Sequence, residues 1–255
     1  MPNPVRAILF DFDGTISTLR CGWEPVMADL MRGLLNDPAM DAAIDDYISE
    51  STGIQTIHQM KWLSEQLKYK SPDQPAPDPW ALKDEYNRHL MRMVSERTHA
   101  LQSGALNPDD CLVPGARDML QTLYSLGVKL YVASGTDDAD VKREAQLLRL
   151  KDFFTRIEGA PPRSESCSKE KVIADLMRKE HLAGDAFAVV GDGKVEIALG
   201  HQAGARTLGI ASDEINRQGI NPQKAARLKQ AGADLVLGDF TQTIQILTCL
   251  GLHTP

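Results

Sequence analysis

Cysteine is scarce in this sequence, and the four cysteines lie far apart. Cys21, Cys111, Cys167 and Cys249 show no paired spacing, so the sequence indicates neither a zinc site nor a disulfide framework. We expect them to be reduced and mostly buried. A chain of 255 residues is long enough to bury a substantial hydrophobic core without such crosslinks.

Long apolar runs are also missing. None approaches the roughly 20 apolar residues that a membrane-spanning helix needs. The first residues show no basic region followed by an apolar stretch and a cleavage site, so we expect no signal peptide. These observations predict a cytoplasmic protein with no membrane partner.

Basic residues are in the minority, with 28 Lys and Arg against 35 Asp and Glu and a formal net charge of -7. A general nucleic-acid binder depends on a basic surface, so we expect no nucleic-acid partner. A small anionic substrate needs only a local positive pocket, which a metal ion, a lysine and backbone amides supply. The 42% apolar and 25% charged residues are close to the average for soluble globular proteins.

Short apolar runs rich in branched residues alternate with helix-like segments after residue 112. This alternation predicts an α/β fold, a Rossmann-like parallel sheet with helices on both faces. The expected strands are residues 5–10, 128–134, 186–192, 205–211 and 233–239, and the expected helices of this part are residues 115–127, 138–150, 168–182 and 222–232.

Residues 18–111 interrupt the alternation, because they contain helix-like patterns and no convincing strand. A structureless loop of that length would be unusual in a compact protein. We therefore predict an inserted all-helical domain at 18–111, with a proline-rich connection at 70–79, inside an α/β core formed by residues 1–17 and 112–255.

Polar residues gather where the predicted strands end, and ligands of open parallel sheets bind at that edge. Each residue alone has an ordinary explanation as a turn former or a solvated helix residue. Their occurrence together, in one order, favours a functional site. They are Asp11 and Asp13 after the first strand, Ser134 and Gly135 after the second, Lys169 at a predicted helix start, and Asp192, Lys194 and Glu196 around a later strand end.

This ordered set resembles the haloacid dehalogenase-like hydrolase superfamily, whose phosphatases carry an Asp-x-Asp-Gly-Thr loop, a Ser or Thr, a Lys, and a Gly-Asp segment with a further acid. The resemblance covers residues 5–17 and 112–240. The insert stands in the place of the family's helical cap and looks most like the phosphoglycolate phosphatase-type branch. The matching residues are Asp11-Phe12-Asp13-Gly14-Thr15, Ser134, Lys169, and Gly191-Asp192 with Glu196.

The resemblance implies a magnesium-dependent phosphatase that hydrolyses a small phosphorylated metabolite through an aspartyl-phosphate. Asp11 would be the nucleophile, and Asp13 would act as general acid and then general base. Lys169, which we prefer to the nearby Lys171, would offset negative charge. Mg²⁺ would be held by Asp11, Asp13 through its backbone carbonyl, Asp192, and Glu196 through a water. The phosphate would be bound by Gly14, Thr15, Ser134, Gly135 and Lys169.

Several alternatives stay open or lose support at this level. A haloacid dehalogenase has no need of the second acid, Asp13. A phosphonoacetaldehyde-type hydrolase needs a Schiff-base lysine in its cap, and Lys61, Lys68 and Lys70 lie on ordinary polar helix faces. A phosphomutase shares the nucleophile, metal and acid-base residue and stays open, as does a catalytically silent binding protein.

Substrate identity would lie in the insert. Arg20, Trp23 and the loop at 51–55 either contact a leaving group or serve packing, surface charge and chain connection. The first strand is not followed by the glycine-rich turn of a dinucleotide-binding fold. The oligomeric state stays open.

Overall fold

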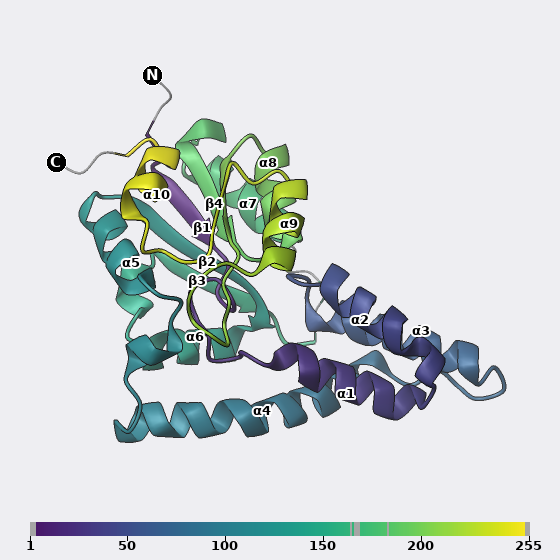
Figure 1. Ribbon diagram of the computed structural model, residues 1–255. Helices are drawn as coiled ribbons and strands as arrows, with labels where there is room; N and C mark the ends of the chain where they lie inside the picture. Colours follow the sequence, from purple (N-terminus) through teal and green to yellow (C-terminus); the bar gives the residue numbers. More distant parts are fainter. Residues whose placement is uncertain (1–3, 164, 166–168, 183, 253–255) are drawn as a thin grey trace.

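The computed structural model describes residues 4–252 except 164, 166–168 and 183. Its centre is one parallel sheet with the strand order β3-β2-β1-β4-β5-β6 (Figure 1). The strands are β1 (Ala7–Phe10), β2 (Lys129–Asp137), β3 (Arg156–Ala160), β4 (Phe187–Gly191), β5 (Arg206–Ile210) and β6 (Leu235–Leu237). Since β1 is central and pairs with β2 and β4, the loops after these three strands meet at one edge of the sheet.

Alternate side chains of β1 point to opposite faces of the sheet, and each face is covered by helices. Ile8 and Phe10 are buried in one cluster with α5 (Ala116–Ser125), α6 (Asp138–Leu147) and α10 (Thr243–Cys249). Ala7 and Leu9 are buried on the other face with α7 (Lys169–Lys179) and α8 (Lys194–Gln202), and α9 (Pro222–Gln230) packs beside α8. The predicted α/β fold is confirmed.

The insert folds as four helices with a buried cluster of their own. They are α1 (Trp23–Leu35), α2 (Asp41–Glu50), α3 (Thr56–Lys70) and α4 (Pro79–Ser103), gathered to one side of the core (Figure 1). Asp78 caps α4 by accepting a hydrogen bond from the Trp80 amide, with Pro79 in the first turn, so the proline-rich connection ends where the longest helix begins. The all-helical character of the insert is confirmed.

The two chain segments that join insert and core lie against each other. Ser17 and Leu112 form an antiparallel bridge, and the Thr18 amide donates to the Cys111 carbonyl at 2.9 Å. We propose that the boundaries of the insert lie at this paired segment, at 17/18 and 111/112. Motion of the insert would then be limited to hinges on either side of it.

Some elements were not predicted. The edge strand β3 has one buried branched residue, Ile157, in the sequence RIEGA, so no apolar run marks it. The short helices α2, α8 and α10 were also missed. Cys21, Cys111 and Cys249 carry free thiols, whereas Cys167 and the predicted helix start at Ser168 lie outside the described residues. Short 3₁₀ turns lie at Pro38–Met40, Pro108–Cys111, Lys151–Phe153 and Gly184–Ala186.

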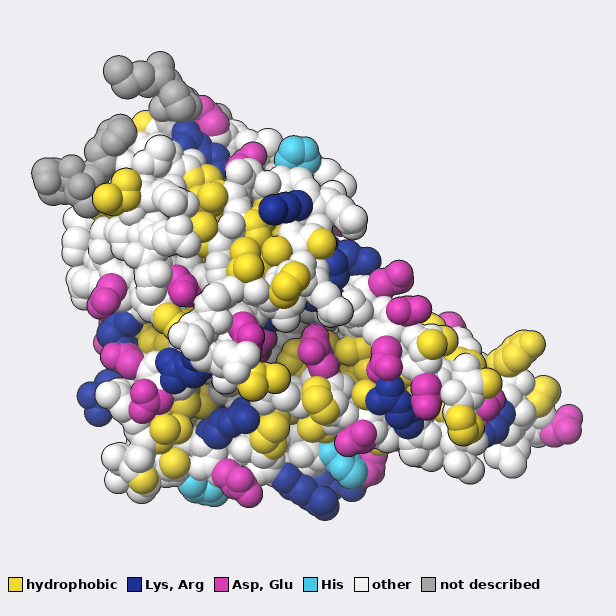
Figure 2. Space-filling model, viewed as in Figure 1, with side chains coloured by type: hydrophobic (Ala, Val, Ile, Leu, Met, Phe, Trp, Pro, Cys, Tyr) yellow, Lys and Arg dark blue, Asp and Glu magenta, His cyan; other side chains and the backbone are white. Residues whose placement is uncertain are grey.

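Both signs of charge occur on the visible surface (Figure 2). Figure 2 shows Lys and Arg side chains interspersed with Asp and Glu over the visible face of core and insert. Each helix in the described part of the chain is too short or too polar to cross a membrane.

Candidate active site

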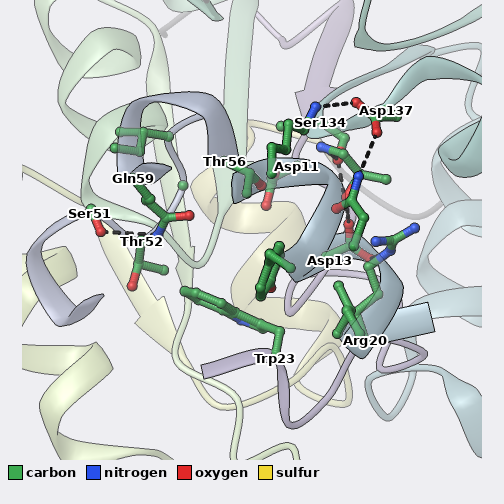
Figure 3. A pocket seen from close by; sticks show the side chains of 18 of the residues that line it. Asp11, Asp13, Arg20, Trp23, Ser51, Thr52, Thr56, Gln59, Ser134 and Asp137 are labelled. Carbon is green, nitrogen blue, oxygen red and sulfur yellow. Dashed lines mark hydrogen bonds and ion pairs between the residues drawn. The ribbon is translucent and has the colours of Figure 1, made fainter. Parts of the chain in front are cut away.

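A cavity lies at the carboxyl ends of β1, β2 and β4, underneath the helical insert. Figure 3 shows that its walls come from both parts of the chain: Asp11, Asp13 and Ser134 from the core, and Trp23 and Thr52 from the insert. The sheet therefore brings together residues more than 100 positions apart, as the predicted strand ends required.

Asp11 follows β1 directly, and its carboxylate is held by a lysine. Lys169 Nζ, at the first residue of α7, donates to Asp11 Oδ1 at 2.8 Å and to Glu196 Oε2 at 3.0 Å. All three side chains are buried, whereas Lys171 is exposed. The structure thus places Lys169, and not Lys171, beside the predicted nucleophile.

Burial is the largest influence on the pKa values of this cluster. It raises the pKa of Asp11 to about 6, although the Lys169 ammonium opposes the shift and Asp192 adds to it. Burial likewise raises the pKa of Glu196 to about 7, again against Lys169. Burial alone would lower the pKa of Lys169, but Asp11 and Glu196 outweigh it and raise that pKa above its ordinary value. Lys169 therefore stays charged at neutral pH.

Three of the predicted metal-binding acids converge. Asp11, Asp192 and Glu196 each offer a carboxylate oxygen, and these oxygens lie within 4.8 Å of one another. Glu196 Oε1 also accepts from the Gly193 amide at 2.8 Å, and its Oε2 accepts from Lys169, so both of its oxygens are engaged. A buried all-oxygen donor set fits Mg²⁺, with Glu196 suited to contact through water.

Asp192 is fixed from both sides. Its Oδ2 accepts from Lys224 Nζ at 2.8 Å, and its Oδ1 faces the Thr15 hydroxyl at 3.4 Å. Gly14 has a left-handed φ of 75°, and a Cβ there would lie 2.3 Å from Asp192 Oδ2, so only glycine fits. Gly14 and the fully buried Thr15 thus support Asp192, and their role in phosphate binding stays a prediction.

Asp13 points to a different part of the cavity than Asp11 does. Its Oδ2 accepts from Thr136 Oγ1 at 2.7 Å and from Ser134 Oγ at 3.5 Å. Its Oδ1 is buried without a hydrogen-bond partner, with Arg20 Nε 3.9 Å away. Burial raises the pKa of Asp13 to about 6, against the opposing charge of Arg20. Asp13 is therefore a carboxyl that titrates near neutrality in the cavity wall, with Oδ2 beside the cavity-lining hydroxyls of Ser134 and Thr136 and Oδ1 enclosed beside Arg20.

Arg20 is not a surface charge, contrary to one of the readings considered for it. Its Nη2 and Nε donate to the two carboxylate oxygens of Glu144 at 2.7 and 3.2 Å, and Glu144 is completely buried. Arg20 Nη2 also lies 3.5 Å from Asp140. Arg20 thus ties the nucleophile loop to α6 and places its guanidinium beside Asp13.

This ion pair gives a stability prediction. Replacing Arg20 with methionine leaves Glu144 buried without its partner, so we expect the free energy of unfolding to fall by about 3–5 kcal/mol in urea titrations. The second replacement Glu144→Leu should recover most of that loss. Arg32→Met, which removes an exposed pair with Asp45, should change little. Equal effects of Arg20→Met and Arg32→Met would contradict the buried pairing.

The loop between α2 and α3, residues 51–55, covers the site. Gly53 has a φ of 90°, and a Cβ there would lie 2.8 Å from Glu196 Oε2. On the other side, a Cβ on Gly135 would lie 3.0 Å from the Ile54 carbonyl oxygen. Backbone of the insert therefore touches both the acidic cluster and the loop after β2, and Trp23 lies beside it in Figure 3.

The three lysines considered for a Schiff base are engaged elsewhere. Lys61 pairs with Glu165 at 2.5 Å on the surface, and Lys68 and Lys70 donate to backbone carbonyls. Lys83, a lysine of α4 that was not considered, does line the cavity. Lys194, placed in a loop by the sequence, is the first residue of α8.

Several residues of the site carry no local sequence signal. They lie on helices or beside strand ends, and only the tertiary fold shows which of their neighbours they meet. On an amphipathic helix, the sequence alone does not distinguish a charged residue that lines a site from one that faces solvent. The missed residues are Lys83, Asn87, Thr136, Asp137, Glu144, Glu214 and Lys224.

Comparison with known proteins places the chain in a family. The model of the haloacid dehalogenase-like hydrolases matches residues 5–204, and the chain belongs to this family. A comparison with curated proteins finds no match.

Solved structures share the fold over nearly the whole chain. A predicted phosphoglycolate phosphatase from Haemophilus somnus is 17% identical, with a TM-score of 0.63 and 95% of this chain and 97% of that chain covered. A phosphonoacetaldehyde hydrolase-like protein from Oleispira antarctica is 15% identical (TM-score 0.67; 98% and 93% covered). A β-phosphoglucomutase from Clostridium difficile is 14% identical (TM-score 0.64; 97% and 97% covered). At these identities the likeness shows a common fold.

Proposed function

We propose that this hydrolase is a magnesium-dependent phosphatase that acts on a small phosphomonoester through an aspartyl-phosphate. The observation that carries the proposal is that the two carboxylates of one loop have different surroundings. Asp11 is held by Lys169 next to the acidic cluster, whereas Asp13 lies outside that cluster, between the hydroxyl groups of Thr136 and Ser134 and the Arg20 guanidinium. Two structural neighbours, a predicted phosphoglycolate phosphatase and a β-phosphoglucomutase, are named for phosphoryl chemistry, which agrees with the proposal.

The residues divide the reaction between them. An Asp11 oxygen attacks phosphorus, and the Asp13 carboxyl gives its proton to the leaving oxygen and then takes one from the attacking water. Lys169 keeps Asp11 oriented and offsets its charge, while the Ser134 hydroxyl and the Gly135 amide hold phosphoryl oxygens. Asp11, Asp192, the Asp13 carbonyl and, through water, Glu196 would hold Mg²⁺, which supplies charge neutralisation at the phosphoryl oxygens.

Phosphate release tests the proposal directly. Wild-type protein should release phosphate from p-nitrophenyl phosphate and from a panel of small phosphorylated metabolites with Mg²⁺, and EDTA in excess should stop the release. Release that is unchanged by EDTA would rule out the metal-dependent reaction. The cytoplasm remains the predicted location.

A phosphomutase is the second candidate, because the 51–55 loop closes on Glu196 and Gly135 and would keep water from the phosphoenzyme. The discriminating measurement is the fate of the phosphoryl group. A phosphatase yields inorganic phosphate in amounts equal to the alcohol. A mutase yields an isomeric phosphate ester with little phosphate release.

Magnesium binding should be linked to pH. The site carboxylates must lose their protons to bind the ion, and burial raises the pKa of Asp11 to about 6 and of Glu196 to about 7. Saturating MgCl₂ should therefore raise the Tm by about 2 °C or less near pH 5 and by several degrees near pH 7.5, as measured by thermal unfolding without substrate.

Two variants serve as controls for this shift. Asp192→Asn should lose the magnesium effect at both pH values, whereas the exposed Asp152→Asn should keep it. A shift of the same size at both pH values would argue against a site built from the buried carboxylates.

A further inference from the structure

The cavity continues past Asp13 to a polar group shared by insert and core. Lys83 Nζ of α4 donates to Asp137 Oδ1 at 2.5 Å, and Asn87 Nδ2 donates to Asp137 Oδ2 at 3.2 Å. Figure 3 shows both bonds converging on Asp137 at the side of the cavity opposite Ser51 and Gln59. We call Lys83, Asn87 and Asp137 the polar clamp.

The clamp lines the same cavity as Asp13, the predicted proton donor to the leaving group. Thr136 donates to Asp13 Oδ2 at 2.7 Å, and Asp137 is the next residue in the chain. A leaving oxygen that takes its proton from Asp13 would therefore lie in the same cavity as Asp137, with its neighbouring carbons within reach of the clamp. The insert lines this cavity with the clamp residues Lys83 and Asn87 on one side, with Ser51 and Thr52 on the opposite side, and with Trp23 (Figure 3).

Charge balance argues against a second anion in this part of the cavity. Among the described residues that line it, the cations are Arg20, Lys83 and Lys169, and each is already paired with a carboxylate. Arg20 faces both Glu144 and Asp140, so its surroundings carry an excess of negative charge. An extra carboxylate or phosphate on the leaving group would meet no uncompensated positive charge.

The clamp is instead matched to hydroxyl groups. A hydroxyl both donates and accepts, and it needs a donor and an acceptor side by side. The Lys83 ammonium has three N–H groups and one carboxylate partner, and the Asp137 side chain keeps 33% of its surface exposed. The Trp23 ring adds a flat apolar surface for the carbon skeleton between hydroxyls.

We infer that the leaving group is a neutral polyhydroxylated one, so that the substrate is a sugar or alditol phosphate bound through Lys83, Asn87 and Asp137. This inference rests on the proposed phosphatase function and specifies the leaving group of that reaction. It assigns to α4 the recognition of hydroxyls on carbons next to the phosphate ester.

Two measurements on the full chain separate this inference from the phosphatase proposal. The first is kcat/KM with Mg²⁺ for a panel: hexose 6-phosphates, alditol phosphates, an alkyl phosphate, a carboxylate-bearing phosphomonoester and p-nitrophenyl phosphate. The second is calorimetric binding of the same phosphates to Asp11→Asn, which needs no turnover. We expect the best polyhydroxylated ester to exceed the alkyl and carboxylate-bearing esters by at least about tenfold in both.

Variants assign the preference to the clamp. Lys83→Met and, separately, Asn87→Leu should lower the ratio of kcat/KM between the polyhydroxylated and the alkyl ester by about 10- to 100-fold, since Lys83→Met loses a charged donor and Asn87→Leu loses the amide that holds the Asp137 carboxylate. Lys61→Met is the matched control, because Lys61 pairs with Glu165 on the surface, and the ratio should stay at its wild-type value. The Tm of each variant checks that it is folded.

The outcomes are distinct. Magnesium-dependent hydrolysis with a preference for the carboxylate-bearing ester, or with no preference for hydroxyls, overturns the inference and leaves the phosphatase proposal standing. A polyhydroxylated preference that Lys83→Met and Asn87→Leu both leave unchanged also overturns the assignment to the clamp. Tight binding of sugar phosphates to Asp11→Asn without any phosphate release by the wild type supports the inference and rejects the phosphatase.

Discussion

Replacing Asp11 with asparagine is expected to abolish magnesium-dependent phosphate release, with a loss of more than about 1,000-fold in kcat. The amide keeps the size of the side chain but cannot form the acyl phosphate. It also removes the charge that Lys169 pairs with at 2.8 Å, and one of the three oxygens of the acidic cluster. The measurement is phosphate release at saturating substrate and Mg²⁺, with p-nitrophenyl phosphate as the first substrate.

The matched control for Asp11→Asn is the exposed Asp152→Asn, which should retain wild-type turnover. Thermal unfolding of Asp11→Asn should show a folded protein, because loss of a buried carboxylate whose pKa is raised by burial removes an unfavourable charge at neutral pH. Substantial turnover in Asp11→Asn would assign the nucleophile to another group and reject the aspartyl-phosphate.

The sequence predicted those parts of the molecule whose signals are local. The apolar run of β1, with Ile8 and Phe10 buried on one face of the sheet, marked the strand. The two acids directly after this run marked the edge of the sheet where the site lies. Lys169 was preferred to Lys171 because it precedes the apolar positions of the predicted helix at the spacing common in the family it resembles, and its ammonium contacts Asp11. By contrast, β3 escaped prediction, because an edge strand with one buried branched residue has no apolar run.

The contacts that hold the site together depend on packing between distant segments. Arg20 and Glu144 are 124 residues apart, and Lys83 and Asp137 are 54 apart, so neither pairing has a sequence spacing that marks it. Lys224 sits on α9 in a pattern that fits a solvated helix face, yet its ammonium reaches Asp192 and Glu214. Buried charges of this kind are found only when the fold fixes which helix covers which strand end.

Replacing Asp13 with asparagine should separate the two halves of the reaction. An alkyl alcohol needs a proton from Asp13 to leave, whereas p-nitrophenolate is a good leaving group without one, so the loss in kcat/KM should be larger for an alkyl phosphate, about 100- to 10,000-fold. In this variant, hydrolysis of the phosphoenzyme also lacks the base that activates water. With p-nitrophenyl phosphate, the variant should therefore release a burst of p-nitrophenol and accumulate phosphoenzyme.

The phosphoenzyme of Asp13→Asn should be visible by intact-mass measurement after acid quenching, as an increase of one phosphoryl group, and it should be absent from the double variant Asp11→Asn/Asp13→Asn. The geometry around Asp13 supports this expectation. Asp13 Oδ1 has no hydrogen-bond partner and lies 3.9 Å from Arg20, while Oδ2 is fixed by Thr136, so an asparagine can keep the position and lose only the proton transfer. Equal losses for both esters without any covalent adduct would mean that Asp13 only positions the substrate, and the acid-base role would pass to another group in the cavity.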